Sequence, residues 1–127
     1  MLFRSQVSVE RLVDSPVMMG LNAKSVPLTA TEVLDMVGDE PKNLNPSDAT
    51  IQTFKNLVEE ARSLFGARHY RTYHFLASFS SYGAWEGLEH NECSEDGSGA
   101  DDLTSDVPGV TYLFSQDRKS TRLNSSH

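Results

Sequence analysis

Histidine and cysteine side chains gather between residues 69 and 93, which raises the question of a metal site. His90 and Cys93 are a nearby pair of potential zinc ligands, but zinc sites need three or four ligands and two do not make one. His69 and His74 would lie on opposite faces of one strand, which argues against a metal shared between them. We therefore interpret these histidines as structural.

The carboxylates and the charge balance restrict the function further. Glu89 is one of 18 acidic residues and, taken alone, is interpreted as a solvated surface carboxylate. Four later acidic residues lack the order of an EF-hand, which favours a solvated loop over a calcium site: Glu95, Asp96, Asp101 and Asp102. The formal net charge is -7, and no cluster of Lys and Arg occurs between residues 1 and 116, which argues against a nucleic-acid partner.

The single cysteine and the apolar runs bound the remaining classes. Cys93 has no second cysteine to pair with, so an internal disulfide is excluded and the compartment stays open. Cys93 also lies in an acidic stretch with little to lower its pKa, which argues against a cysteine nucleophile. No apolar run approaches the roughly 20 residues that a bilayer requires, so no membrane span is predicted.

The clearest predicted element is a helix that begins near residues 45–48. Asn45-Pro46-Ser47-Asp48 offers an N-cap, a proline at the first helical position and an acid in the first turn. Apolar residues then recur at spacings of three and four and predict one buried face: Ile51, Phe54, Leu57, Val58, Ala61, Leu64 and Phe65. Gly66 suits a left-handed stop.

Two strands are predicted after this helix. Residues 70–79 alternate with a period of two and predict a central strand, and residues 84–90 predict a second strand at an edge. Residues 92–106 are acidic and rich in Ser and Gly and predict a solvated loop. A further helix could begin at Pro108.

The segments before residue 45 give weaker patterns. Residues 5–13 predict a short strand, and residues 17–19 a helical turn. Residues 31–37 fit either a short helix or an irregular link, and residues 38–45 predict a loop.

The last residues, 117–127, differ in character from the rest of the chain. Their sequence, DRKSTRLNSSH, is basic and polar, and resembles the translation of one reading frame of a widely used sequencing-library adapter. On this interpretation the native protein ends near Ser115, and Gln116 is a junction codon that encoded His or Gln. The alternative is a genuine disordered basic tail.

Three stretches together resemble the glycyl aminopeptidase type of zinc metallopeptidase, a gluzincin-like family. They are Leu-Val-Asp-Ser-Pro within residues 9–16, Phe-Gly-Ala-Arg-His-Tyr-Arg-Thr-Tyr-His-Phe-Leu at residues 65–76, and Gly-Leu-Glu-His at residues 87–90. In that family a helix ending in Phe-Gly precedes a His-Tyr strand, a Gly-Leu-Glu-His segment, a polar loop and the His-Glu-x-x-His helix. The resemblance covers most of residues 8–115.

The resemblance implies an α+β fragment cut just before the zinc-binding helix. Residues 1–34 would be the end of an N-terminal β domain, residues 35–116 the start of a thermolysin-like catalytic domain, and residues 117–127 the non-native tail. Zinc would be bound by the full-length parent, with the first zinc histidine replaced at Gln116, and the fragment itself would bind no metal and be inactive.

The substrate side of such a peptidase would survive in the fragment. By resemblance, an edge strand pairs with the peptide substrate, Glu89 binds its free amine, Gly87 lets the backbone approach, and Leu88 packs beneath. The family often has Gly-Gly or Phe-Gly before Leu-Glu-His, whereas this chain has Glu86-Gly87, which leaves exopeptidase preference open.

A small interaction module is the alternative. In this interpretation residues 45–90 form a non-catalytic α/β unit that binds a partner through an exposed strand. It predicts cooperative folding of residues 1–116 and no catalytic continuation in the gene.

Overall fold

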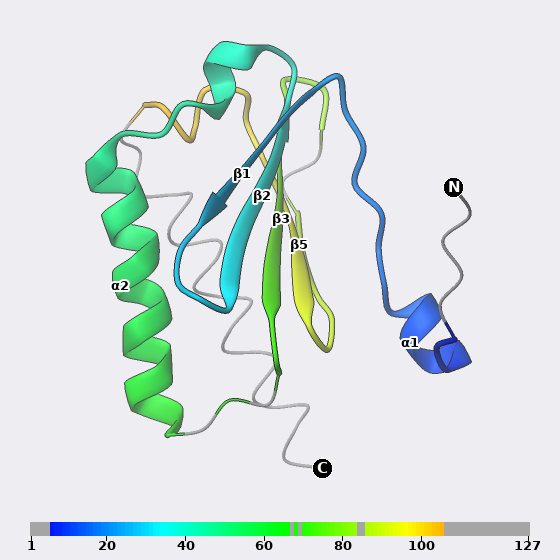
Figure 1. The fold of residues 1–127 in the computed structure, drawn as a ribbon. Coiled ribbons are helices and arrows are strands. Elements are labelled where there is room, and N and C mark those ends of the chain that lie inside the picture. The colour runs from blue at the N-terminus through cyan, green and yellow to red at the C-terminus, as the bar shows by residue number, and fades with distance from the viewer. Residues whose placement is uncertain (1–5, 67, 69, 84–85, 106–127) are drawn as a thin grey trace.

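The fold is α+β, with a five-stranded mixed sheet and one long helix across one of its faces (Figure 1). A computed structural model describes residues 6–66, 68, 70–83 and 86–105. In chain order the elements are α1 (Val9–Val13), β1 (Asn22–Pro27), β2 (Glu32–Gly38), the 3-10 helix η1 (Pro41–Leu44), α2 (Asp48–Phe65), β3 (Tyr73–Phe79), β4 (Glu86–Glu89) and β5 (Cys93–Ser98).

The strand order is β1-β2-β3-β5-β4, so β3 is central and the shortest strand, β4, lies at an edge. Strands β2, β3 and β5 run parallel, whereas β1 is antiparallel to β2 and β4 is antiparallel to β5. Helix α2 makes the long connection from β2 to β3 that two parallel neighbours require. The central position of β3 and the edge position of β4 confirm the predictions for these segments.

Helix α2 covers the inner face of the sheet. Its N-cap is Ser47, whose hydroxyl accepts from the Thr50 N–H at 3.1 Å, so the helix begins later than Asn45 and Pro46 precedes the cap. Phe54 and Val58 are buried, but Leu64 is 71% exposed, so the predicted apolar stripe is narrower than expected.

Strand β3 supplies the centre of the core. Its inward side chains are Tyr73, Phe75, Ala77 and Phe79, each 3% exposed or less, and their outward neighbours are half-buried. They pack with Phe54 and Val58 of α2 and with other buried apolar residues: Leu28, Leu34, Met36, Leu44 and Leu103. Full burial of one large apolar side chain contributes roughly 1.5–3 kcal/mol, so the burial of Tyr73, Phe75 and Phe79 contributes several kcal/mol to stability.

Strands β2 and β5 correct two predictions. Residues 31–37 were expected to be a short helix or an irregular link, and residues 92–106 a solvated loop, yet both contain strands of the same sheet. Their inward positions include buried polar side chains, Glu32 in β2 and Ser94, Asp96 and Ser98 in β5. A polar residue at a core-facing position removes the apolar alternation on which a strand prediction rests.

The N-terminal segment also differs from its prediction. Residues 5–13 were expected to form a strand, but Val9–Val13 form helix α1, because the Ser8 hydroxyl caps the Arg11 N–H at 3.2 Å. Residues 17–19 form no helical turn, and residues 41–44 of the expected loop form η1. The helix start at Pro108, the Gln116 junction and the tail at residues 117–127 lie outside the described residues.

The extent of the sheet bears on the expected domain boundary, and the lengths of the helices bear on membrane insertion. The division expected between residues 34 and 35 falls within β2, so one sheet continues across it. Within the described ranges, no helix is both long and apolar enough to cross a membrane.

Gly66 gives a stability test for the end of α2. Its φ of 65° lies in the left-handed region, and a Cβ added there would meet nothing within 4 Å, so a side chain brings backbone strain alone. We expect Gly66→Ala to lower the free energy of unfolding by about 1 kcal/mol in urea denaturation. Gly83→Ala is the control, since a Cβ there makes only an ordinary 3.6 Å contact with Ser80. Equal stability of the two variants would contradict the assignment of the left-handed cap.

Candidate functional site

The Gly87-Leu88-Glu89 segment lies on β4, whose outer side faces no other strand in the described part of the chain. Gly87 stands opposite Asp96 and Glu89 opposite Ser94, so the Glu89 side chain points to the inner face that α2 covers. Leu88 stands opposite Glu95 and points to the outer face. Among the described residues, this edge of the sheet thus presents backbone donors and acceptors of β4, with the Glu89 carboxylate at the end of the strand.

The three residues of this segment differ in exposure. Gly87 is exposed, and Glu89 is half-buried at the end of the strand. Leu88 is 54% exposed and does not pack beneath the strand as expected, because its side chain points away from α2. The substrate role of these residues stays a prediction.

The residue after β4, His90, holds together two carboxylates from distant parts of the chain. Its Nδ1 lies 2.9 Å from Asp14 Oδ1, and its Nε2 lies 3.1 Å from Glu95 Oε2. Its side chain is 11% exposed. The second oxygen of Asp14 accepts the Asn91 N–H at 2.9 Å. Sequence patterns did not indicate this cluster, since Asp14 and His90 are separated by 76 positions.

Charge in the cluster shifts two pKa values in opposite directions. Burial lowers the pKa of His90, but its hydrogen bonds to Asp14 and Glu95, together with the charges of these two residues, outweigh burial and raise that pKa above the usual range. The Asn91 N–H, followed by the His90 hydrogen bond, holds the pKa of Asp14 below its ordinary value. Both shifts favour the charged pair.

Cys93 begins β5 on the outer face, next to His74 of β3 in register. Burial, followed by the charges of Asp14, Glu95 and Glu92, raises the pKa of the Cys93 thiol to about 11. A thiol with this pKa is protonated at neutral pH and is a poor nucleophile. The raised pKa supports the interpretation that Cys93 is not a nucleophile. The expected loop at this position is wrong, because Cys93 is the first residue of strand β5.

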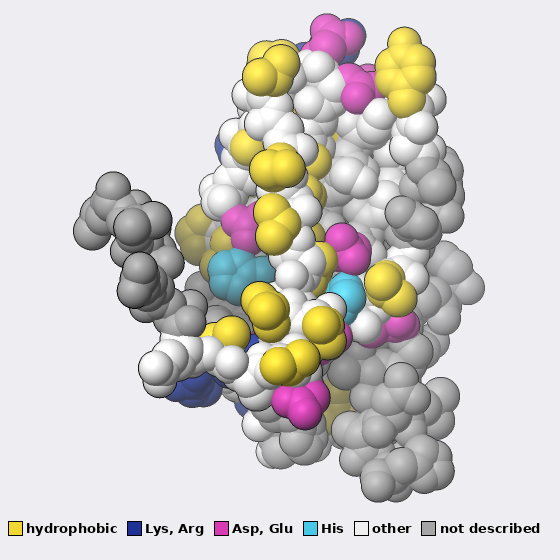
Figure 2. Space-filling model, turned by 90° about the vertical axis from the view of Figure 1, so that its right-hand side faces the viewer, with side chains coloured by type: hydrophobic (Ala, Val, Ile, Leu, Met, Phe, Trp, Pro, Cys, Tyr) yellow, Lys and Arg dark blue, Asp and Glu magenta, His cyan; other side chains and the backbone are white. Residues whose placement is uncertain are grey.

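A second histidine that is paired with a carboxylate lies on the same outer face (Figure 2). His74 Nδ1 is 2.6 Å from Asp35 Oδ2, and the Ser25 hydroxyl donates to the other oxygen of Asp35. The three residues come from β3, β2 and β1 and fix the orientation of the imidazole. The expected structural role of His74 is consistent with this pairing, whereas His69 lies outside the described residues.

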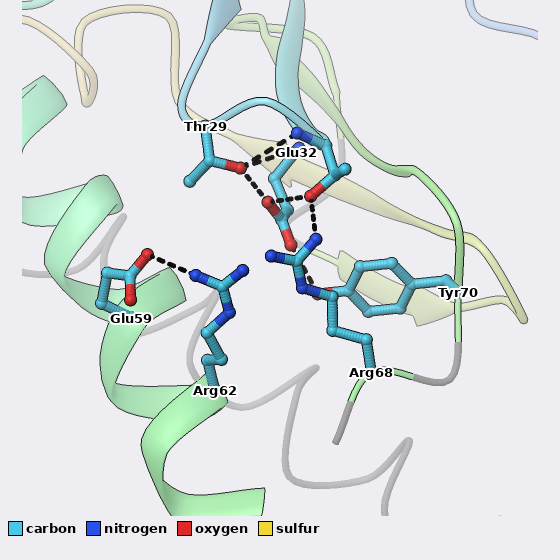
Figure 3. Close-up of polar contacts among 7 residues, drawn as sticks. Thr29, Glu32, Glu59, Arg62, Arg68 and Tyr70 are labelled. Carbon is cyan, nitrogen blue, oxygen red and sulfur yellow. Dashed lines mark hydrogen bonds and ion pairs between the residues drawn. The ribbon is translucent and has the colours of Figure 1, made fainter. Parts of the chain in front are cut away.

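A buried carboxylate, Glu32, joins the start of β2 to the segment between α2 and β3 (Figure 3). Glu32 is 2% exposed. Its carboxylate accepts hydrogen bonds from the Tyr70 hydroxyl at 3.0 Å and from the Thr31 hydroxyl at 2.8 Å. The Thr29 hydroxyl also donates to it, and Arg68 donates to Thr31 at 2.6 Å. This network holds the segment that leads into the central strand.

Across the described residues, no three His, Cys, Asp or Glu side chains are arranged to hold a metal ion. The His90 cluster therefore offers hydrogen bonding and charge, and the edge of β4 offers backbone pairing beside a carboxylate.

Comparison with known proteins extends the assignment of the fold. No family model and no curated protein matches the sequence. A crystal structure of an aminopeptidase N family protein from Idiomarina loihiensis matches 76% of this chain, with a TM-score of 0.54 and 16% sequence identity. The chain spans 18% of the length of that protein. The likeness confirms the α+β fold, which resembles part of an aminopeptidase N family protein, and shows nothing finer than the fold.

The Glu32 network gives a second stability test. Tyr70→Phe removes a hydroxyl that donates to a buried carboxylate, so we expect the free energy of unfolding to fall by about 1.5–3 kcal/mol. Tyr82→Phe is the matched control, because Tyr82 is 95% exposed and its hydroxyl should contribute little. Urea denaturation measures both variants, and an unchanged midpoint for Tyr70→Phe would show that the hydrogen bond contributes no net stability.

The thiol of Cys93 gives a pH-dependent test. With a pKa of about 11, its thiolate is scarce at pH 8, so alkylation by iodoacetamide should be roughly one hundred-fold slower in the folded chain than in urea. The folded rate should rise with pH up to an inflection near 11. An inflection near the ordinary thiol range would contradict the effect of burial and of the neighbouring carboxylates.

Proposed function

We propose that this chain forms the substrate-binding edge of the catalytic domain of a zinc-dependent metallopeptidase, in which it binds the N-terminal part of a peptide. One observation carries the proposal. The Gly87-Leu88-Glu89 segment forms the antiparallel edge strand of a sheet whose fold is similar to part of an aminopeptidase N family protein.

Backbone pairing would supply most of the affinity. An extended peptide can add to β4 as a further strand, through the N–H and C=O groups that β4 does not use with β5. Gly87 has no side chain at this edge, which allows close approach of the peptide backbone. Such pairing is independent of the peptide side chains, so β4 alone would select for an extended backbone.

Glu89 would add selection for a free N-terminus. Its carboxylate is half-buried at the end of β4 and points to the inner face. A carboxylate there can accept a charge-assisted hydrogen bond from an α-ammonium group, which is about twice as strong as a neutral hydrogen bond. The aminopeptidase interpretation therefore depends on this one side chain more than on any other.

Zinc and the residues that activate water would come from another part of the parent protein. The described residues do not fit a zinc site, since no group of three potential ligands converges among them. Gln116, the position expected for the first zinc histidine, lies outside the described residues. In this proposal the chain binds peptide but does not hydrolyse it.

The gene tests the peptidase assignment directly. We expect the source locus, sequenced through codon 116 with unrelated primers, to encode His-Glu-x-x-His directly after Ser115. A continuation into DRKSTRLNSSH and a stop codon would reject the assignment and favour a small interaction module that uses the same exposed edge.

A binding experiment tests the role of Glu89. We expect a short peptide with a free N-terminus to shift the amide resonances of β4, and Glu89→Gln to weaken its binding about tenfold because a charge-assisted hydrogen bond is lost. The N-acetylated form of the same peptide should bind equally to both proteins. Glu60→Gln, at an exposed position of α2, is the control variant.

The outcomes separate the two candidate functions. Tenfold weaker binding that is confined to the free-amine peptide supports an aminopeptidase role for Glu89. Equal affinity for the free-amine and N-acetylated peptides, unchanged by Glu89→Gln, supports an interaction module. The absence of any shift in the amide resonances of β4 contradicts peptide binding at this edge.

A further inference from the structure

We infer that His90 is a pH-operated latch that holds residues 6–21, here called the N-terminal arm, against the turn between β4 and β5. The inference rests on the position of His90 between two carboxylates and does not depend on the proposed peptidase function.

The arm has little apolar hold on the sheet. Helix α1 buries none of its residues, and Met18 is half-buried, but the other large apolar side chains of the arm are exposed: Val7, Val9, Leu12, Val13, Val17, Met19 and Leu21. In the described structure, the polar contacts between the arm and the rest of the chain are with the β4–β5 turn. Arg11 pairs with Glu92, and Asp14 binds His90 and accepts the Asn91 N–H. The arm is therefore held in place mainly by charge and hydrogen bonds.

The chemistry of His90 makes this hold dependent on protonation. Both ring nitrogens face carboxylate oxygens, Asp14 Oδ1 at 2.9 Å and Glu95 Oε2 at 3.1 Å, and ionised carboxylates only accept hydrogen bonds. A neutral imidazole has one N–H and can satisfy only one of them, whereas the imidazolium satisfies both. When His90 loses its proton, one nitrogen lone pair faces a carboxylate, and the bridge between arm and sheet loses a donor.

Other charges around the latch reinforce the same direction. Glu92 and Glu95 add negative charge, which favours the imidazolium, while the cation of Arg11 is engaged with Glu92. The Cys93 thiol stays neutral at the relevant pH because its pKa is raised to about 11. Among the outer-face residues, His74 is hydrogen-bonded to Asp35 on β2 and forms a separate pair.

The sign of the pH dependence follows from the two shifted groups. Because the pKa of His90 is raised, its contribution is fully present below the ordinary value of about 6.5 and is lost as the pH rises through the raised value. Because the pKa of Asp14 is lowered, its contribution is present above its ordinary value and is lost as the pH falls through the lowered value. The latch is closed between these two limits.

Amide hydrogen exchange on the complete chain tests the latch. The Asn91 N–H donates to Asp14, so its exchange, corrected for the intrinsic effect of pH, reports whether the arm is closed. We expect this exchange to accelerate as His90 is deprotonated, by tenfold for each unit that separates the His90 pKa in the closed and open arm. The amide of residue 90 donates to the Cys93 carbonyl within the turn and should not change.

Three variants sharpen the test. His90→Gln should make the exchange at Asn91 fast at every pH above the titration of Asp14, and Asp14→Asn should lower the His90 pKa measured by NMR. Asp35→Asn, which removes the partner of His74, should leave both readouts unchanged.

Two outcomes would overturn the latch. One is an Asn91 exchange rate, corrected for pH, that stays constant through the His90 titration. The other is a His90 pKa that is the same in the Asp14→Asn variant as in the original protein.

Discussion

The contact between the inner face of β3 and helix α2 is the constraint on which the other elements depend. Phe75 and Phe79 are 1% exposed or less, and they pack with Phe54 of α2, which comes before them in the chain. A central strand fixed in this way offers two edges for parallel pairing, to β2 on one side and β5 on the other. Within the part of the chain that the structure describes, strand β4 pairs with β5 alone, so the position of the candidate edge follows from the packing of the core.

Sequence patterns predicted the parts of the fold whose apolar periodicity is uninterrupted. The helix at residues 48–65 and the strand at 73–79 follow this rule, and the glycine stop of the helix was also expected from local chemistry. Strands β2 and β5 were missed because polar side chains occupy some of their inward positions, Glu32 in β2 and Ser94, Asp96 and Ser98 in β5. Glu32 accepts from Tyr70, which lies beyond α2, and Ser94 donates to Asp96 of the same strand at 2.9 Å, so hydrogen bonds make these buried polar positions tolerable.

The two candidate sites also differ in how far the sequence could predict them. The assignment of Gly87 and Glu89 came from a family resemblance, and the structure adds that the strand bearing them lies at an edge. The His90 cluster could not be predicted, because Asp14 is hydrogen-bonded to residues 90 and 91 across most of the described chain. Local patterns carry no information about such a pair, since it exists only after the sheet has placed the β4–β5 turn.

Glu89, the last residue of β4, and His90, the residue after it, face opposite sides of the sheet. Glu89 points to the inner face, where α2 and β3 enclose the core, while His90 faces the arm on the outer face with Glu95. A ligand that pairs with the free edge of β4 would contact backbone that leads directly into His90. Because Glu89 and His90 are adjacent in the chain, movement of the turn would alter both surroundings together. The end of β4 therefore links the surroundings of a carboxylate on one face of the sheet to those of a protonatable imidazole on the other.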